Sequence, residues 1–198
     1  GLDIALRAFK QVVRNVPAAE FHIYGDGSAK ESLVRLTNEL GLNERVRFFQ
    51  PRTAQEIAMI MADADVGVVP KRADSFGDEA YSTKIMEFMA VGVPVIVSST
   101  KVDRYYFNDS IVRFFESGNP EALATEIVAV LRNEELRKRM TAEAFNYAAT
   151  HCWENRKGDY LRLVDSMCAT TEDRSTAVPE TTKAQDRFEA SCYLHRLF

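Results

Sequence analysis

The stretch "GDEAYSTKIMEFMAVGVPVIVS", residues 77–98, decides how this chain should be interpreted. A helical apolar pattern follows the polar step "STK" and ends at a turn containing Gly92 and Pro94, after which comes a run of β-branched residues. A helix that leads into a buried strand is typical of βαβ units. Two glutamates, Glu79 and Glu87, flank the start of the predicted helix and are candidate ligand-binding groups.

The rest of the chain repeats this alternation and then changes character at Pro120, beyond which only helical patterns occur. Alternating strands and helices predict an α/β fold: a Rossmann-like, mostly parallel sheet with helices on both faces, followed by C-terminal helices. Ser28 and Thr53 are the predicted N-caps of two helices. The predicted helices before Pro120 are 1–13, 28–42, 53–64 and 83–91, and the predicted strands are 19–27, 45–50, 65–70, 94–98 and 111–115.

The domain organisation follows from the same patterns. Residues 1–167 are predicted to form one domain, and residues 168–198 a disordered polar tail whose end, "RFEASCYLHRLF", could form a short helix. The sequence enters an amphipathic helix directly after Gly1, so we expect it to be part of a longer protein.

Composition excludes several classes of protein. A net charge of −4 argues against nucleic-acid binding, which usually needs a basic surface. No apolar run approaches the roughly 20 residues that span a bilayer. The three cysteines lack metal-ligand spacing and indicate reduced thiols, so we expect a cytoplasmic protein.

Three segments follow predicted strands, and the carboxyl ends of parallel strands share one edge of the sheet, where ligands bind. They are "YGDGS" with Gly25 and Gly27, "QPRT" with Arg52, and the loop that carries Glu79. Each also has a plainer interpretation, because the glycines can simply turn the chain and Arg52 can be a surface charge.

The two glutamates suit an elongated ligand. In one continuous helix they would stand roughly 12 Å apart along the axis and about 80° apart around it, too far to hold one small group. Carboxylates accept hydrogen bonds from vicinal hydroxyls, and free amides near Ser82 and Thr83, with Lys84, favour a phosphate. Such a pair also occurs by chance and Lys84 can be a solvated helix residue, but Glu87 interrupts an otherwise apolar face.

The ordered series "YGDGS", "VRFFQPR", "EIAMIMADADVGVVP", "EAYSTKIMEFMAVGVPVIVS" and "CWEN…YLRLV" resembles the C-terminal domain of GT-B retaining glycosyltransferases of family 4 over about residues 1–167. Its most specific element is E-x7-E before a G-x-P-V strand. The resemblance implies that Glu79 contacts the donor hexose near the reacting carbon and is the catalytic-site residue. Glu87 would hold the ribose.

The resemblance assigns the remaining candidates to the same donor. Ser82, Thr83 and Lys84 would lie beside the diphosphate, Gly25 and Gly27 would let the backbone approach the donor, and the loop around Arg52 would lie by the base. No metal ion or other cofactor is expected; the substrate would be a UDP- or GDP-sugar.

This chain departs from the family pattern in three ways. Tyr81 and Ser82 replace the common Phe-Gly after the first glutamate, and "STKVDRYYFND" replaces a glycine pair, as in a subgroup associated with surface-polysaccharide assembly. The first strand of the domain, its basic residues and the acceptor-binding N-terminal domain would precede Gly1. The chain would therefore lack a middle strand.

The implied function is transfer of a hexose, with retention of configuration, to a glycan or lipid-linked acceptor. The chain would be the donor-binding part and inactive alone. Peripheral membrane attachment, which such enzymes can show, would usually be carried by the absent half. Two alternatives stay open: a non-catalytic Rossmann-like interaction or regulatory module, and a GT-B-like sugar-nucleotide epimerase, although no paired histidine supports the latter.

Overall fold

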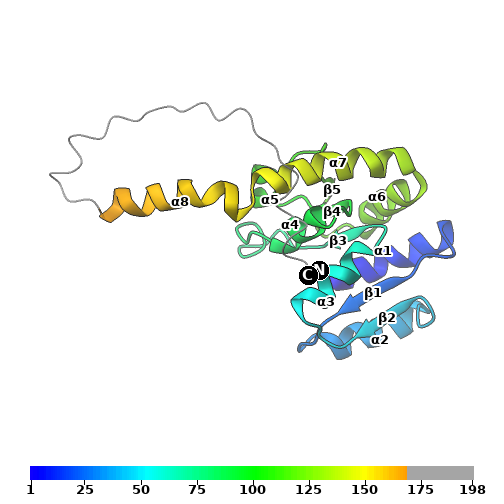
Figure 1. Cartoon of the computed structure of the whole chain (residues 1–198). Helices are drawn as coiled ribbons and strands as arrows, with labels where there is room; N and C mark the ends of the chain where they lie inside the picture. The colour runs from blue at the N-terminus through cyan, green and yellow to red at the C-terminus, as the bar shows by residue number, and fades with distance from the viewer. Residues whose placement is uncertain (169–198) are drawn as a thin grey trace. The chain divides into compact units, whose positions relative to one another are not determined.

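The computed structural model describes residues 1–168 (Figure 1). A compact unit covers Gly1–Ala149, and a second unit begins at Thr150, whose described part contains helix α8, Trp153–Cys168. The predicted tail and terminal helix lie almost entirely outside the described residues, and the predicted boundary at residue 167 stays a prediction. Among residues 1–168, no helix combines the length and apolar character that crossing a membrane requires.

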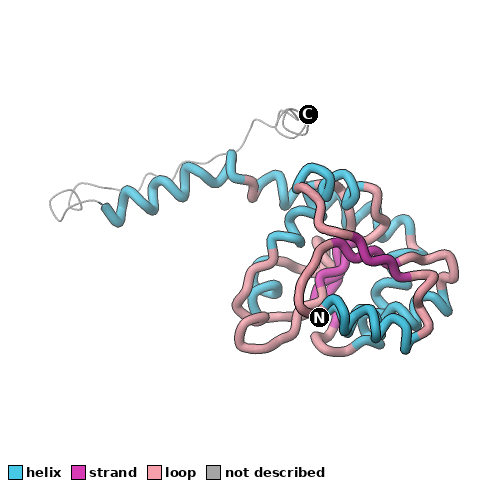
Figure 2. The backbone as a smooth tube through the Cα atoms, turned by 90° about the horizontal axis from the view of Figure 1, so that it is seen from below, coloured by secondary structure: helices cyan, strands magenta, loops and turns pink. Residues whose placement is uncertain are grey.

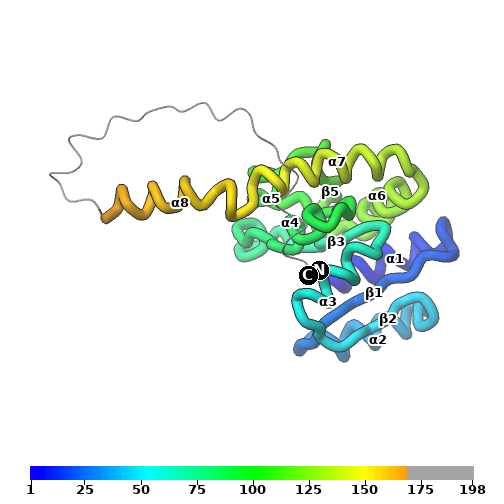
Figure 3. Tube along the Cα trace, in the orientation of Figure 1, coloured from blue at the N-terminus to red at the C-terminus, as the bar shows by residue number. Residues whose placement is uncertain are grey.

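The compact unit is an α/β fold, as predicted, in which strands and helices alternate along the chain (Figure 3). The strands are β1 (Phe21–Tyr24), β2 (Val46–Phe49), β3 (Gly67–Val69), β4 (Val95–Ser98) and β5 (Arg113–Phe115). The helices are α1 (Leu2–Asn15), α2 (Lys30–Leu40), α3 (Ala54–Ala62), α4 (Thr83–Ala90), α5 (Lys101–Tyr106), α6 (Pro120–Arg132) and α7 (Glu134–Thr150).

All strand pairs among the described residues are parallel, and they form two sheets. Figure 2 draws the strands in magenta among the surrounding helices. One sheet pairs β1 with β2, and the other has the order β3-β4-β5, with Val68 opposite Ile96. No strand pairing connects β1 to β3 within the described part of the chain. The break falls between β2 and β3 in chain order, and the missing middle strand stays a prediction.

Strand β4 is buried on both faces, which is typical of a parallel strand covered by helices. Ile96 belongs to a core cluster built largely from α1, α2 and α6, whereas Val95 and Val97 belong to a second cluster with α4 and α7. Side chains of a strand alternate between faces, so this single strand contributes to both clusters.

The observed N-cap residues can be compared with the two that the sequence predicted, Ser28 and Thr53. Thr53 forms a complete capping box with Glu56, as predicted, but the Ser28 prediction is wrong: α2 begins at Lys30 and its N-cap is Ala29. Helix α5 was not predicted, because it is short and contains β-favouring tyrosines. Its signal was Thr100, whose hydroxyl accepts a hydrogen bond from the Asp103 amide.

Candidate functional site

The start of helix α1 lies next to the start of the loop that follows β3. Arg72, just past β3, forms an ion pair of 2.6 Å with Asp3 in the first turn of α1. A Cβ placed on Gly1 would come within 1.6 Å of the Pro70 carbonyl oxygen. Helix α1 runs from this edge to the start of β1, so β1 returns to the same edge. The packing is therefore compatible with the prediction that the carboxyl ends of these strands converge on one edge.

The segments after β1 and β2 are open. Gly25 has a φ of 130°, and an added Cβ would meet nothing within 4 Å, so the backbone conformation is what requires glycine. Gly27 has equally open surroundings. Arg52 is exposed and lies 3.9 Å from Glu56 in an (i, i+4) ion pair, the surface contact that the plainer interpretation expects.

Glu79 lies in a turn before α4. The Asp74 carboxylate accepts hydrogen bonds from the amides of Phe76 (3.2 Å) and Gly77 (2.7 Å), which shapes this turn. Glu79 is exposed, and its carboxylate has no hydrogen bond or ion pair within residues 1–168. Because α4 begins at Thr83, the continuous-helix spacing considered for the two glutamates does not apply.

The N-terminus of α4 lacks a side-chain cap. Ser82 occupies the N-cap position without a cap hydrogen bond; α1 and α2 also lack a side-chain cap, whereas α3, α5 and α6 have one. The amides of Thr83 and Lys84 have no acceptor in the described part of the chain. The Lys84 side chain is exposed and forms no ion pair there. Free amides at a helix start, next to an unpaired ammonium group, suit an anion.

Glu87 also lies on α4, two residues after the buried Ile85 and two before the buried Met89. Its side chain is exposed and has no partner among the described residues. The expectation that Glu87 interrupts the apolar face is therefore wrong, because the apolar face points to the core and Glu87 points to solvent. Two unpaired carboxylates thus flank one uncapped helix start.

Sequence reasoning missed Lys71 and Asp103. Lys71 follows β3 at its carboxyl end, and its ammonium nitrogen lies 2.8 Å from a carboxylate oxygen of Asp103 on α5. The available signal was the position of Lys71, directly after "VVP".

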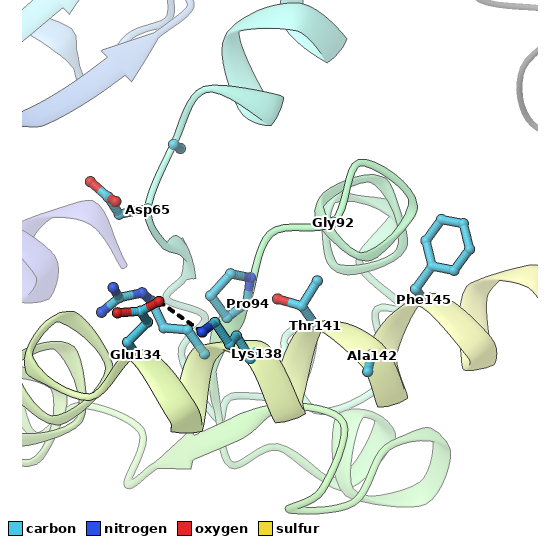
Figure 4. A pocket seen from close by; sticks show the side chains of 10 residues that line it. Asp65, Gly92, Pro94, Glu134, Lys138, Thr141, Ala142 and Phe145 are labelled. Carbon is cyan, nitrogen blue, oxygen red and sulfur yellow. Dashed lines mark ion pairs between the residues drawn. The ribbon is translucent and has the colours of Figure 1, made fainter.

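An open hollow of about 590 Å³ lies at the opposite edge of the sheet (Figure 4). Asp65 precedes β3 and Pro94 precedes β4, so this hollow is at the amino ends of the strands. Glu134 and Lys138 form an ion pair of 2.9 Å on its wall. None of the predicted site residues lines it.

The family model described as "Glycosyl transferases group 1" matches residues 1–147, which is most of the chain. The chain belongs to this family. Group 1 membership confirms that the sequence resembles a glycosyltransferase family over most of its length.

Curated relatives of this group 1 chain are longer. The D-inositol 3-phosphate glycosyltransferase of Corynebacterium diphtheriae is 28% identical over 182 residues, which are 85% of this chain and 42% of that protein. The chain thus spans less than half the length of that relative.

Solved structures show the same fold. The C-terminal domain of the group 1 family protein LpcC from Francisella tularensis has a TM-score of 0.64 at 18% identity, covering 76% of this chain and 78% of that one. HepE from Anabaena, solved with UDP-glucose, has a TM-score of 0.66 at 20% identity, covering 76% of this chain and 40% of that one. The fold is accordingly that of one half of a GT-B glycosyltransferase.

Proposed function

We propose that this chain is the donor-binding half of a retaining glycosyltransferase that transfers a hexose from a UDP- or GDP-sugar. The observation that supports this proposal most directly is the start of α4, which has no side-chain cap. It lies between the carboxylates of Glu79 and Glu87, which have no partner among the described residues. Family membership and the UDP-glucose complex of HepE support a nucleotide-sugar donor. Membership also favours transfer over a non-catalytic module or an epimerase.

Each predicted residue has a role at this site. Glu79 accepts hydrogen bonds from hexose hydroxyls near the reacting carbon, and Glu87 accepts them from the ribose. The amides of Thr83 and Lys84, the Ser82 hydroxyl and the Lys84 ammonium bind the diphosphate. Gly25 and Gly27 allow the backbone to approach the donor. Arg52 lies by the base, and its weak surface contact with Glu56 leaves the guanidinium available.

The reaction breaks the bond between the anomeric carbon and the diphosphate oxygen, and an acceptor hydroxyl oxygen forms the new bond on the same face of the sugar. The proton of that hydroxyl passes to the departing diphosphate oxygen. Negative charge grows on the departing diphosphate, and in this proposal the helix amides and Lys84 stabilise it. The proposal requires no metal ion. The acceptor is a glycan or lipid-linked sugar, bound by a second domain.

Isothermal titration against UDP, GDP and their hexose conjugates tests the proposal, on the 198-residue chain and on the two-domain enzyme. We expect weak nucleoside diphosphate binding by the chain alone and transfer only by the two-domain protein. Lys84→Met should weaken diphosphate binding, whereas Lys138→Met, in the hollow at the opposite edge, should not. Absence of binding to both proteins at millimolar ligand would overturn the proposal.

A further inference from the structure

A buried ion pair connects the loop after β3 to helix α5. Lys71 is the second residue after β3, and its ammonium nitrogen lies 2.9 and 2.8 Å from the two carboxylate oxygens of Asp103. The Asp103 side chain is fully buried, and the Lys71 side chain is 15% exposed. The proposed donor chemistry assigns no role to either residue.

Further hydrogen bonds support the pair and hold the loop backbone. Besides its hydrogen bond to Asp103, Lys71 Nζ donates a second one, of 2.8 Å, to the carbonyl of Ala80. The Thr100 hydroxyl donates to the Asp103 carboxylate at 2.8 Å. Buried charges are tolerated when such partners satisfy them. Because Ala80 directly follows Glu79, the ammonium group fixes the backbone one residue from the predicted donor ligand.

The two ends of the loop have different anchors. At its start, the Lys71 carbonyl accepts hydrogen bonds from the hydroxyls of Ser98 (2.7 Å) and Ser117 (2.9 Å), at the ends of β4 and β5. Farther along, the Asp78 carbonyl and carboxylate accept hydrogen bonds from the first amides of α5. The Lys71 side chain is the contact that joins the start of the loop to Ala80 near its end.

We propose that Lys71 and Asp103 are positioning residues that hold the loop 71–82, and with it Glu79, in the donor-binding arrangement before the donor arrives. This inference rests on the proposed function. Asp103 neutralises Lys71, so the diphosphate is left to Lys84 and the helix amides. A loop held in advance loses less conformational freedom when the transition state forms.

A comparison of single and double variants separates positioning from stability. Lys71→Met alone leaves the Asp103 charge buried without its partner and should lower the Tm. Lys71→Met/Asp103→Asn removes both charges and keeps an acceptor for Thr100, so it should regain most of that Tm loss. The matched control is Arg113→Met/Glu126→Gln, which removes a partly buried ion pair of 2.7 Å between β5 and α6.

The first readout is hydrogen exchange of the peptide 72–82 in the 198-residue chain. We expect about tenfold faster exchange in the Lys71→Met/Asp103→Asn variant, with unchanged exchange in β4 and in the control. The second readout is turnover by the two-domain enzyme, where kcat should fall about tenfold while the donor KM changes little.

The outcomes are distinguishable. If the double variant regains loop protection and kcat together with its Tm, the pair is only structural and the inference is overturned. If the wild-type two-domain enzyme transfers no sugar, the proposed function fails, and the exchange comparison still decides whether the pair holds the loop. Faster loop exchange with an unchanged kcat would also overturn the positioning role.

Discussion

The aromatic ring of Phe88 lies directly over Gly67, so that a Cβ on Gly67 would stand 2.6 Å from the ring. This contact brings α4 against the first residue of β3. Gly67→Ala should therefore destabilise the fold by about 1–3 kcal/mol, because the ring must move out of its packed position. Urea unfolding measures the loss, and Gly67→Ala/Phe88→Leu should recover part of it. Equal losses in the two variants would contradict the close approach.

Substitutions at two N-cap residues, Thr53 and Ser82, should affect stability and ligand binding differently. Thr53→Ala removes a capping box and should cost about 1 kcal/mol of unfolding free energy, measured by urea denaturation. Ser82→Ala removes a hydroxyl that makes no cap hydrogen bond, so it should leave stability nearly unchanged. Under the proposed function, Ser82→Ala weakens diphosphate binding and Thr53→Ala does not. A stability loss for Ser82→Ala as large as that for Thr53→Ala would contradict this distinction.

Tyr81, which is 40% exposed, should make the fold modestly sensitive to alkaline pH. Burial of the phenol, followed by interactions with neighbouring phenols and with the Asp103 carboxylate, raises the pKa of Tyr81 from 10.0 to about 12. The unfolded chain then loses the proton first as pH rises, so this contribution to stability is complete below pH 10 and is lost between pH 10 and about 12.

Unfolding free energies measured from pH 9 to 11.5 test this. Tyr81→Phe should reduce the alkaline loss of stability, whereas Tyr105→Phe, at a side chain that is 82% exposed, should not. The same alkaline slope in wild type and Tyr81→Phe would show that another group is responsible.

The two glutamates should differ in what they contribute. Glu87→Ala in the two-domain enzyme should weaken donor binding by about tenfold or more, as expected from the loss of hydrogen bonds to a charged group. Under the proposed function, Glu79→Ala should weaken binding less and lower turnover more, because Glu79 would contact the hexose near the reacting carbon. Titration with the donor and initial-rate kinetics measure both effects. Similar donor affinities with intact turnover in both variants would refute the assignment.

Sequence patterns predicted the alternating elements because the strands are short apolar runs between periodic helices. Even the fully buried strand β4 was found, since its β-branched run directly follows the turn at Gly92 and Pro94. Helix α5 was missed because it is only six residues long and its cap lies in a polar stretch. Short helices give too little periodicity to be recognised.

The candidate site was predicted in outline only. Residues that follow strands can be located because parallel topology brings their ends to one edge. Lys71 and Asp103 are 32 residues apart, and their contact depends on how α5 packs beside the loop, which no local pattern encodes. The exposure of Glu87 likewise depends on which side of α4 faces the core.

The gap between the two sheets has a consequence for the behaviour of the isolated chain. β1 and β3, like β2 and β5, each have a single strand neighbour among the described residues, so one flank of each strand has no β-partner there. Such flanks act as templates for foreign extended segments. Solutions of the chain alone should therefore show self-association that grows with concentration, visible as rising light scattering. A soluble peptide that pairs with these strand flanks should suppress it.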